Sequence, residues 1–358
     1  MAEGPSGTSI PIDSDKVWVT LITNTSYLPG LLTLAHSLRA VHTKYPLLAL
    51  YTPSLPSSAL SALSARQIPS LPVPFLSPRS GKRYDQDPRF DDCWTKLVVF
   101  QLTQFARVVC LDSDMVVLRN MDELMDLELD DPAEHGTGTG DIPGKRLFAA
   151  SHACVCNPLR RAHYPPTWIP SNCAFTAQHA DPSLAQTQGR DPALTLGALN
   201  SGLLVLNPSR VLFAQILQRM DSHGERYAFP DQDLLADLYA GRWVALPYVY
   251  NALKTMRREG VHAPIWRDES VKNVHFILSP KPWDELDDAG VWAGGDETHR
   301  WWVDANARRI KEERESGLLD GSDTKTPHNG IAPLIMSISR DPGSRVLGVV
   351  RALSTMYI

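Results

Sequence analysis

The chain has 358 residues, of which 43% are hydrophobic and 21% are charged, and its formal net charge is −5. This composition is that of a globular protein with a sizeable core, and the acidic balance argues against a nucleic-acid partner. No apolar run is long enough to cross a membrane. Residues 1–16 are polar and lack the features of a signal peptide, so we expect a disordered N-terminus there. With five cysteines and no secretion signal, we expect reduced thiols and a cytoplasmic location.

Strands and helices alternate in the first third of the chain. Apolar runs predict strands, and Pro29 opens a helix with apolar residues at helical spacing. The strands are predicted at 17–23, 47–51, 71–76 and 105–111, and the helices at 29–41, 57–66 and 90–105. This alternation predicts an α/β fold with a mainly parallel, doubly wound sheet. We interpret residues 17–122 as a nucleotide-binding half.

The pattern loosens after this half and then returns. Residues 130–198 are rich in glycine and proline and are interpreted as an insert. This insert either folds over the donor sugar or is a surface decoration stabilised by Cys154, Cys156 and Cys173. Residues 199–285 form a second, acceptor or catalytic half within one domain over 17–315. Its predicted elements are strands at 199–207, 243–246 and 274–277 and helices at 208–222 and from Pro230. The charged, Trp-rich segment 284–315 receives no assigned element, and 316–358 is interpreted as a linker with a loosely attached tail.

Two aspartates follow directly after the buried strand that ends at Leu111. Asp112 and Asp114 flank Ser113, and ligands of open α/β sheets bind outside the carboxyl ends of the strands. Carboxylates in such a place can hold a hard divalent cation, which would bridge a diphosphate. A triplet of this kind is often only a solvated turn, but Lys96 adds a cation near the same site. We therefore interpret the region as a sugar-nucleotide site.

Other polar residues stand at strand ends. Thr23, Asn24 and Tyr27 follow the first strand, where a base and ribose are expected, although Asn24 could be a turn residue and Tyr27 could cap the core. His275 ends a later strand and is a suitable third ligand for Mn²⁺ beside two carboxylates. Lys281 follows it and could hold the leaving diphosphate.

The cysteines allow two interpretations. A group with the side-chain types of zinc ligands comprises His152, Cys154, Cys156, His163 and Cys173. The Cys-x-Cys spacing is tighter than usual and the remaining partners are scattered. Buried free thiols are therefore favoured over a structural zinc site.

Taken together, the motifs resemble the retaining glycosyltransferases of family 8, the group that holds glycogenin and the plant galactinol synthases. The resemblance covers residues 17–283 in order and approximate spacing. It rests on the segments Val19–Asn24 with Tyr27, Trp94–Leu97, Leu111–Asp114, Leu199–Ser209, Asp231-Gln232, Leu246–Asn251, and His275 with Lys281–Trp283.

This resemblance implies a GT-A fold and a role for each matching residue. Asp112, Asp114 and His275 would hold Mn²⁺, and Lys281 would contact the diphosphate of a UDP-glucose or UDP-galactose donor. Asp231 would lie near the reacting carbon, with Gln232 and Lys281 as the other catalytic candidates. The remaining donor-binding candidates are Leu21, Thr23, Asn24 and Tyr27 around the uridine, Lys96 and Ser113 near the phosphates or sugar, and Asn200, Ser201 and Gln232 near the sugar hydroxyls.

Departures from glycogenin point to the acceptor. Residues 252–273 contain no tyrosine, which argues against self-glucosylation, whereas the long insert, Phe229 and Gln232-Asp233 are similar to galactinol synthase. We expect hexose transfer with retention from a UDP-sugar to a small polyol or sugar. The alternatives are a glycogenin-like enzyme acting on a protein or glucan, and a non-catalytic nucleotide-sugar-binding protein. A nucleotidylyltransferase is disfavoured because its Gly-rich N-terminal loop is missing, and an oligomer is possible.

Overall fold

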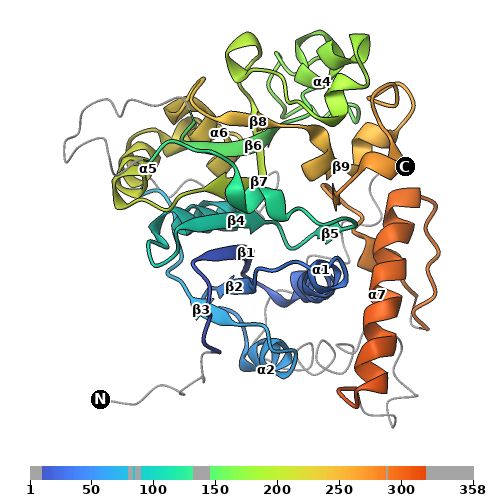
Figure 1. Ribbon diagram of the computed structural model, residues 1–358. Coiled ribbons are helices and arrows are strands. Elements are labelled where there is room, and N and C mark those ends of the chain that lie inside the picture. Colours follow the sequence, from blue (N-terminus) through green and yellow to red (C-terminus); the bar gives the residue numbers. More distant parts are fainter. Residues whose placement is uncertain (1–9, 80–83, 85–89, 132–145, 288, 320–358) are drawn as a thin grey trace.

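The computed structural model describes residues 10–79, 84, 90–131, 146–287 and 289–319. The centre of these residues is a seven-stranded sheet in the order β3-β2-β1-β4-β7-β6-β8, stacked from bottom to top in Figure 1. Its strands are β1 (Lys16–Ile22), β2 (Leu47–Tyr51), β3 (Ser70–Pro72), β4 (Arg107–Leu111), β6 (Phe148–His152), β7 (Leu199–Leu206) and β8 (Val244–Leu246). Most neighbours are parallel, and β7 is antiparallel to both β4 and β6. The predicted α/β class with a mainly parallel sheet is confirmed.

Helices cover both faces of this sheet. The α-helices of the described residues are α1 (Leu28–Ala40), α2 (Ser57–Ala65), α3 (Phe90–Cys93), α4 (Ala174–Ala177), α5 (Arg210–His223), α6 (Pro230–Leu238) and α7 (Glu297–Glu315), of which α4 and α7 lie away from the sheet faces. Alternate side chains of β1 face opposite layers, as the pleat requires. Val17 and Val19 pack in one cluster with residues of α5 and α6, whereas Trp18 packs with Leu34 and Leu38 of α1.

The strand order creates a crevice at one edge of the sheet. From β1 the chain moves outward through β2 to β3, and then returns to place β4 on the other side of β1. The carboxyl ends of β1 and β4 are therefore neighbours at a switch point, where ligands of such sheets bind. A smaller sheet extends this edge, in the order β5-β10-β9, with β5 (Met115–Val117), β9 (Ala252–Leu253) and β10 (Asn273–His275).

Two predicted elements differ from those found. The strand expected at 71–76 is limited to Ser70–Pro72, because Pro72 and Pro74 cannot donate ladder hydrogen bonds. The helix expected at 90–105 is α3 followed by a 3-10 helix over Trp94–Gln101. This stretch includes β-branched residues, which form α-helices less readily.

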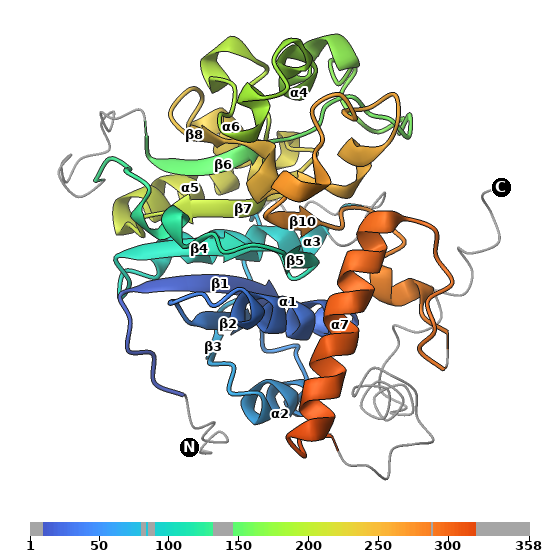
Figure 2. The ribbon, with the colours of Figure 1, turned by 45° about the vertical axis from the view of Figure 1, so that its right-hand side comes forward.

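The insert forms a separate lobe at the top of Figures 1 and 2, around α4. The described residues of the insert are 130–131 and 146–198. Its strand β6 belongs to the central sheet, and the residues after β6 form α4 and short 3-10 turns. The Gly-rich stretch 136–144 and the tail 331–358 lie outside the described residues, as do residues 1–9 of the expected N-terminal segment.

The helix α7 was not predicted from the sequence. It lies against α1 in Figures 1 and 2, and it buries Trp302, Arg309 and Glu313. The Glu313 carboxylate accepts hydrogen bonds of 2.8 Å from Arg309 of its own helix and from Arg66 at the end of α2. Burial opposes ionisation of Glu313, but Arg66 and Arg309 outweigh it, so the pKa of this carboxyl lies below its ordinary value.

We expect Glu313→Gln to lower the free energy of unfolding by about 3 kcal/mol, because it leaves two arginines with an uncompensated positive charge. Urea unfolding at pH 7 measures this loss. Glu315→Gln is the control, since Glu315 is exposed and its ion pair among the described residues is with Lys311 at 3.8 Å, so its loss should stay within about 0.5 kcal/mol.

The same pair of proteins gives a pH test. A carboxyl with a depressed pKa stabilises the fold above its ordinary pKa of 4.5, and this stabilisation is lost as the pH falls. The difference between the unmodified protein and Glu313→Gln should therefore shrink below about pH 4.5. A difference that is constant down to pH 3 would contradict the role of Glu313.

Candidate functional site

The two aspartates lie in the turn between β4 and β5, at the carboxyl end of β4. The strand β5 pairs antiparallel with β10, and His275 is placed opposite Met115. The Phe276 backbone N–H donates to the Asp114 carbonyl oxygen at 2.9 Å. This register brings the imidazole of His275 over the two carboxylates, although His275 is far from both aspartates in the sequence.

These three side chains could hold a divalent cation. The Nε2 atom of His275 lies 3.3 Å from Asp114 Oδ1 and 3.7 Å from Asp112 Oδ2. Metal–ligand bonds of about 2.1 to 2.4 Å separate neighbouring atoms of an octahedral site by about 3.0 to 3.4 Å, so the set fits with a small shift of Asp112. Two carboxylates and an imidazole suit Mn²⁺ or a similar hard to borderline ion.

Two asparagines hold the histidine in place. The Oδ1 atom of Asn251 lies 3.0 Å from His275 Nδ1, and Asn251 Nδ2 donates to Asn200 Oδ1 at 2.8 Å. With Nδ1–H donating to this amide oxygen, the lone pair of Nε2 faces the carboxylates, as a metal ligand requires. Asn251 received no role from the sequence, although it lies in one of the segments that carry the family resemblance.

A glycine makes room for the same imidazole. A Cβ atom on Gly202 would lie 2.3 Å from His275 Cε1, which is far inside contact distance. Gly202 also accepts a hydrogen bond of 2.8 Å from the Asp112 backbone N–H through its carbonyl oxygen. The strand β7 therefore packs closely against two parts of the carboxylate–histidine cluster of Asp112, Asp114 and His275. These parts are the imidazole of His275 and the backbone of Asp112.

Lys96 joins two of the candidate carboxylates. Its ammonium lies 2.7 Å from Asp112 Oδ1 and 3.3 Å from Asp231 Oδ2, and it donates to the Ser201 carbonyl oxygen at 3.4 Å. Burial opposes the charge of Lys96, but Asp112 and Asp231 outweigh it and hold its pKa well above the usual value. Asp231 Oδ2 is buried and accepts no hydrogen bond of good geometry from the described residues, so it retains capacity for a ligand.

Lys281 pairs with the second aspartate of the motif. Its ammonium donates to Asp114 Oδ2 and, at 2.7 Å, to the Phe276 carbonyl oxygen, and it lies 5.6 Å from the centre of the Tyr27 ring. Burial opposes ionisation of Asp114, but Lys281 and His275 outweigh it, so the pKa of this carboxyl is well below its ordinary value. Asp114 is thus an anion in the folded protein, ready to act as a ligand.

The residues expected around a uridine lie at the end of β1. Thr23 donates to Asp92 Oδ2 at 2.7 Å, and Asn24 accepts from the Ser26 N–H at 3.1 Å, so Asn24 acts as a turn residue here. Leu21 and Tyr27 are half-buried, and Tyr27 packs edge-on against Trp283 at 5.8 Å. Asp92 was not among the residues predicted from the sequence, and Trp283 was given no role there.

The other candidates lie on β7 and α6. Asn200 is bonded within the cluster through Asn251, and Ser201 contributes its carbonyl oxygen to Lys96. Ser113 is buried, and its carbonyl oxygen closely approaches Gly30 of α1. Gln232 is half-buried in the first turn of α6, and its side chain makes no hydrogen bond with any described residue. The structure therefore brings Lys96, Asp112, Asp114, Asn200, Ser201, Asp231, His275 and Lys281 into one connected cluster.

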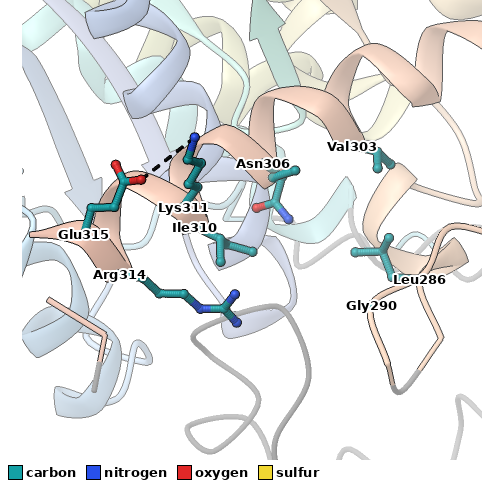
Figure 3. Close-up of a pocket in the computed structure, with 9 residues that line it drawn as sticks. Leu286, Gly290, Val303, Asn306, Ile310, Lys311, Arg314 and Glu315 are labelled. Carbon is teal, nitrogen blue, oxygen red and sulfur yellow. Dashed lines mark ion pairs between the residues drawn. The ribbon is translucent and has the colours of Figure 1, made fainter. Parts of the chain in front are cut away.

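A separate hollow borders α7, between that helix and the segment near Leu286 and Gly290 (Figure 3). Its polar lining includes Lys311 and Glu315, which form an ion pair at 3.8 Å. No residue of the carboxylate–histidine cluster lines it. We therefore assign the candidate site to the crevice at β4 and not to this hollow.

With this geometry in hand, comparison with known proteins identifies the class. The sequence profile of the glycosyltransferases described as "Glycosyl transferase family 8" matches residues 18–287. The match covers most of the chain, and the protein belongs to this family.

Individual relatives are distant. "Uncharacterized protein R707" of Acanthamoeba polyphaga mimivirus is 25% identical over 278 residues, which are 76% of this chain and 84% of the relative. "Galactinol synthase 1" of Arabidopsis thaliana is 24% identical over 281 residues, covering 76% and 72% of the two chains. "Glycogenin" of Neurospora crassa is 24% identical over 295 residues, covering 81% of this chain but spanning only 34% of that protein.

A solved structure supports the fold. The glycosyltransferase GlyE of Streptococcus pneumoniae TIGR4 superposes with a TM-score of 0.53 at 14% sequence identity, covering 85% of this chain and 64% of that one. The fold is the GT-A type of glycosyltransferases, as the family resemblance predicted. Among the described residues, no helix combines the length and the apolar character needed to span a membrane.

The close fit of Gly202 gives a test of the cluster. We expect Gly202→Ala to lower the free energy of unfolding by about 1 to 3 kcal/mol, because the new Cβ displaces the buried His275 ring. Gly295→Ala is the matched control, because its Cβ would meet nothing within 4 Å and both changes reduce the freedom of the unfolded chain equally. Guanidinium unfolding compares them, and equal stabilities would refute the tight packing of His275.

Proposed function

We propose that the protein is a Mn²⁺-dependent, retaining hexosyltransferase that moves glucose or galactose from a UDP-sugar to a small polyol or sugar acceptor. Residues 17–315 would act as one catalytic domain, with a nucleotide-binding half at 17–122, an insert at 130–198 and an acceptor half at 199–285. The observation that carries the proposal is the cluster of Asp112, Asp114 and His275 with two buried lysines beside it.

The cluster suits a diphosphate leaving group. Mn²⁺ held by Asp112, Asp114 and His275 would supply positive charge to the departing UDP. Lys281 donates two of its three N–H groups to described residues, so one donor remains for a phosphate oxygen. A cation held in a fixed position at the leaving oxygens stabilises the charge that develops as the sugar departs.

The acid nearest the reacting carbon is proposed to be Asp231. The Lys96 ammonium lies 3.3 Å from Asp231 Oδ2 and stabilises its negative charge, which makes it a weaker nucleophile. This pairing favours front-face transfer over a covalent intermediate on Asp231. In the front-face reaction the bond from the anomeric carbon to the phosphate breaks, the acceptor oxygen bonds on the same face, and its proton passes to the leaving phosphate oxygen. Asp231 and Gln232 would then orient sugar hydroxyls.

The donor nucleotide is proposed to lie along the end of β1. Leu21, Thr23 and Asn24 would surround the uridine, and the half-buried Tyr27 ring offers a face for the base. Thr23 is held by Asp92, so its position is fixed before a ligand arrives. A nucleotide in this position would have its diphosphate close to Lys281, whose ammonium lies near the Tyr27 ring.

The acceptor side is proposed to be closed by the insert. Trp168 of the insert stacks on Phe229 with ring centres 4.8 Å apart, and Tyr164 packs edge-on against the same ring at 5.1 Å. Phe229 directly precedes the helix that carries Asp231 and Gln232. An aromatic cover at this place would exclude water, the competing nucleophile, and would favour a small acceptor such as inositol.

The enzyme is further proposed to work in a reducing compartment such as the cytoplasm. All five cysteines, Cys93, Cys110, Cys154, Cys156 and Cys173, are without a disulfide bond, which supports this location.

The metal-dependent reaction is tested by UDP release from UDP-glucose and UDP-galactose with Mn²⁺ and a panel of polyols and sugars as acceptors. We expect EDTA to stop release, Mn²⁺ to restore it, and Asp114→Ala to reduce it at least about 100-fold, because a metal ligand is lost. Asp304→Ala on the exposed face of α7 is the control and should release UDP at the unmodified rate.

Circular dichroism of both variants would show whether Asp114→Ala still folds. Turnover that survives both EDTA and Asp114→Ala would refute the proposed metal site. UDP binding by calorimetry without any turnover would instead support the non-catalytic alternative.

Self-modification separates the proposal from a glycogenin-like enzyme. Residues 252–273 contain no tyrosine, so incubation with UDP-glucose and Mn²⁺ should add no hexose to the chain. Intact-protein mass spectrometry measures this directly. A series of hexose additions would favour the glycogenin-like alternative, whose acceptor is the protein itself.

A further inference from the structure

Four side chains of the types that bind zinc lie close together, three in the insert and one in the acceptor half, away from the carboxylate–histidine cluster. Cys154 and Cys156 follow β6, Cys173 precedes α4, and His262 comes from the loop between β9 and β10. Their ligand atoms all lie within 4.8 Å of one another. The His262 side chain is fully buried, and Cys173 is nearly so.

The distances around His262 are those of a tetrahedral site. The Nε2 atom of His262 lies 3.3 Å from the sulfur of Cys154, 3.3 Å from that of Cys156 and 3.5 Å from that of Cys173. Zinc bonds of about 2.3 Å to sulfur and about 2.0 Å to nitrogen, at the tetrahedral angle, separate sulfur from nitrogen by about 3.5 Å. The three sulfur–nitrogen distances are therefore close to those expected when one tetrahedral zinc ion is bound by all four side chains.

Free thiols explain this arrangement poorly. A neutral imidazole nitrogen has one lone pair, so Nε2 can accept a hydrogen bond from only one of three thiols. His179 Nε2 lies 3.0 Å from His262 Nδ1, so the other nitrogen of His262 already has a partner. A hydrogen bond at Nδ1 that leaves Nε2 for a cation is the usual support of a metal-bound histidine.

We propose that Cys154, Cys156, Cys173 and His262 bind one structural Zn²⁺ ion. Four protein ligands fill a tetrahedral site and leave no position for water or substrate, so the ion has a structural and not a catalytic role. The preference for free thiols drawn from the sequence is thereby reversed. The ligand set also differs from the sequence group, because both ring nitrogens of His152 contact carbonyl oxygens and His163 is exposed.

The ion would join the insert to the acceptor half. Three ligands belong to the segment 154–173, and His262 belongs to the polypeptide between β9 and β10 of the small sheet. Trp168 lies between Cys156 and Cys173 in the chain and packs on Phe229 beside α6. Zinc would therefore fix the segment that covers the proposed acceptor side.

The test is the metal content of the intact protein, purified after expression in medium supplied with zinc. Plasma mass spectrometry should find about one zinc per chain. Cys173→Ser should lose at least half of it, whereas Cys93→Ser should keep it, because Cys93 lies outside the cluster. Asp114→Ala should also keep it, which separates this site from the carboxylate–histidine cluster. Zinc that is retained by Cys173→Ser, or lost equally from Cys93→Ser, would overturn the assignment.

A second measurement needs no variant. Replacing the metal of the unmodified protein with Co²⁺ should give the intense visible bands and sulfur-to-cobalt charge-transfer absorption of a tetrahedral thiolate site. This spectrum decides the proposal even if Cys173→Ser fails to fold. An unmodified protein that contains less than about one zinc in five chains and gives no such spectrum with Co²⁺ would refute it.

Discussion

The arrangement of the site depends on the pairing of buried charges at the end of β4. Lys96, Lys281, Asp114 and Asp231 are each almost fully buried, and an unpaired charge in such a place costs several kcal/mol. The protein avoids this cost by placing one lysine between Asp112 and Asp231 and the other against Asp114. Each ion pair joins segments from different parts of the chain. The need to pair these buried charges therefore also fixes the relative positions of the segments that carry them.

The rest of the crevice is fitted around these pairs. The small sheet exists at the point where β5 leaves the aspartates, and its pairing with β10 delivers both His275 and the backbone that receives Lys281. On the other side, Gly202 leaves space for the imidazole, and Asn251 selects its tautomer. A ligand that enters the site thus meets charges and donors that are already oriented, which is the condition for electrostatic catalysis.

The sequence alone predicted those elements and site residues that a local pattern of residues indicates. Strand β2 was predicted at its observed bounds, α6 was predicted from Pro230, and the aspartates lie at the strand end where the alternation of β and α elements placed them. Features that depend on tertiary contact were missed. His262 has no cysteine near it in the sequence, so only the fold reveals it as a fourth ligand. The helix α7 was missed because its buried face carries Arg309 and Glu313, which a pattern of apolar residues does not detect.

That charged face of α7 has a consequence for the boundaries of the folding unit. The family match stops at residue 287, but α7 lies beyond it and contacts the end of α2 and the helix α1. Arg66 donates to Glu313, and Thr33 donates to Asn306 at 3.1 Å. A fragment that ended at residue 287 would lack α7. The helix α1 would then lose the helix that packs against it, and Arg66 would lose the Glu313 carboxylate. By burial and charge pairing, α7 therefore belongs to the same folded unit as α1 and α2, although the family match ends before it.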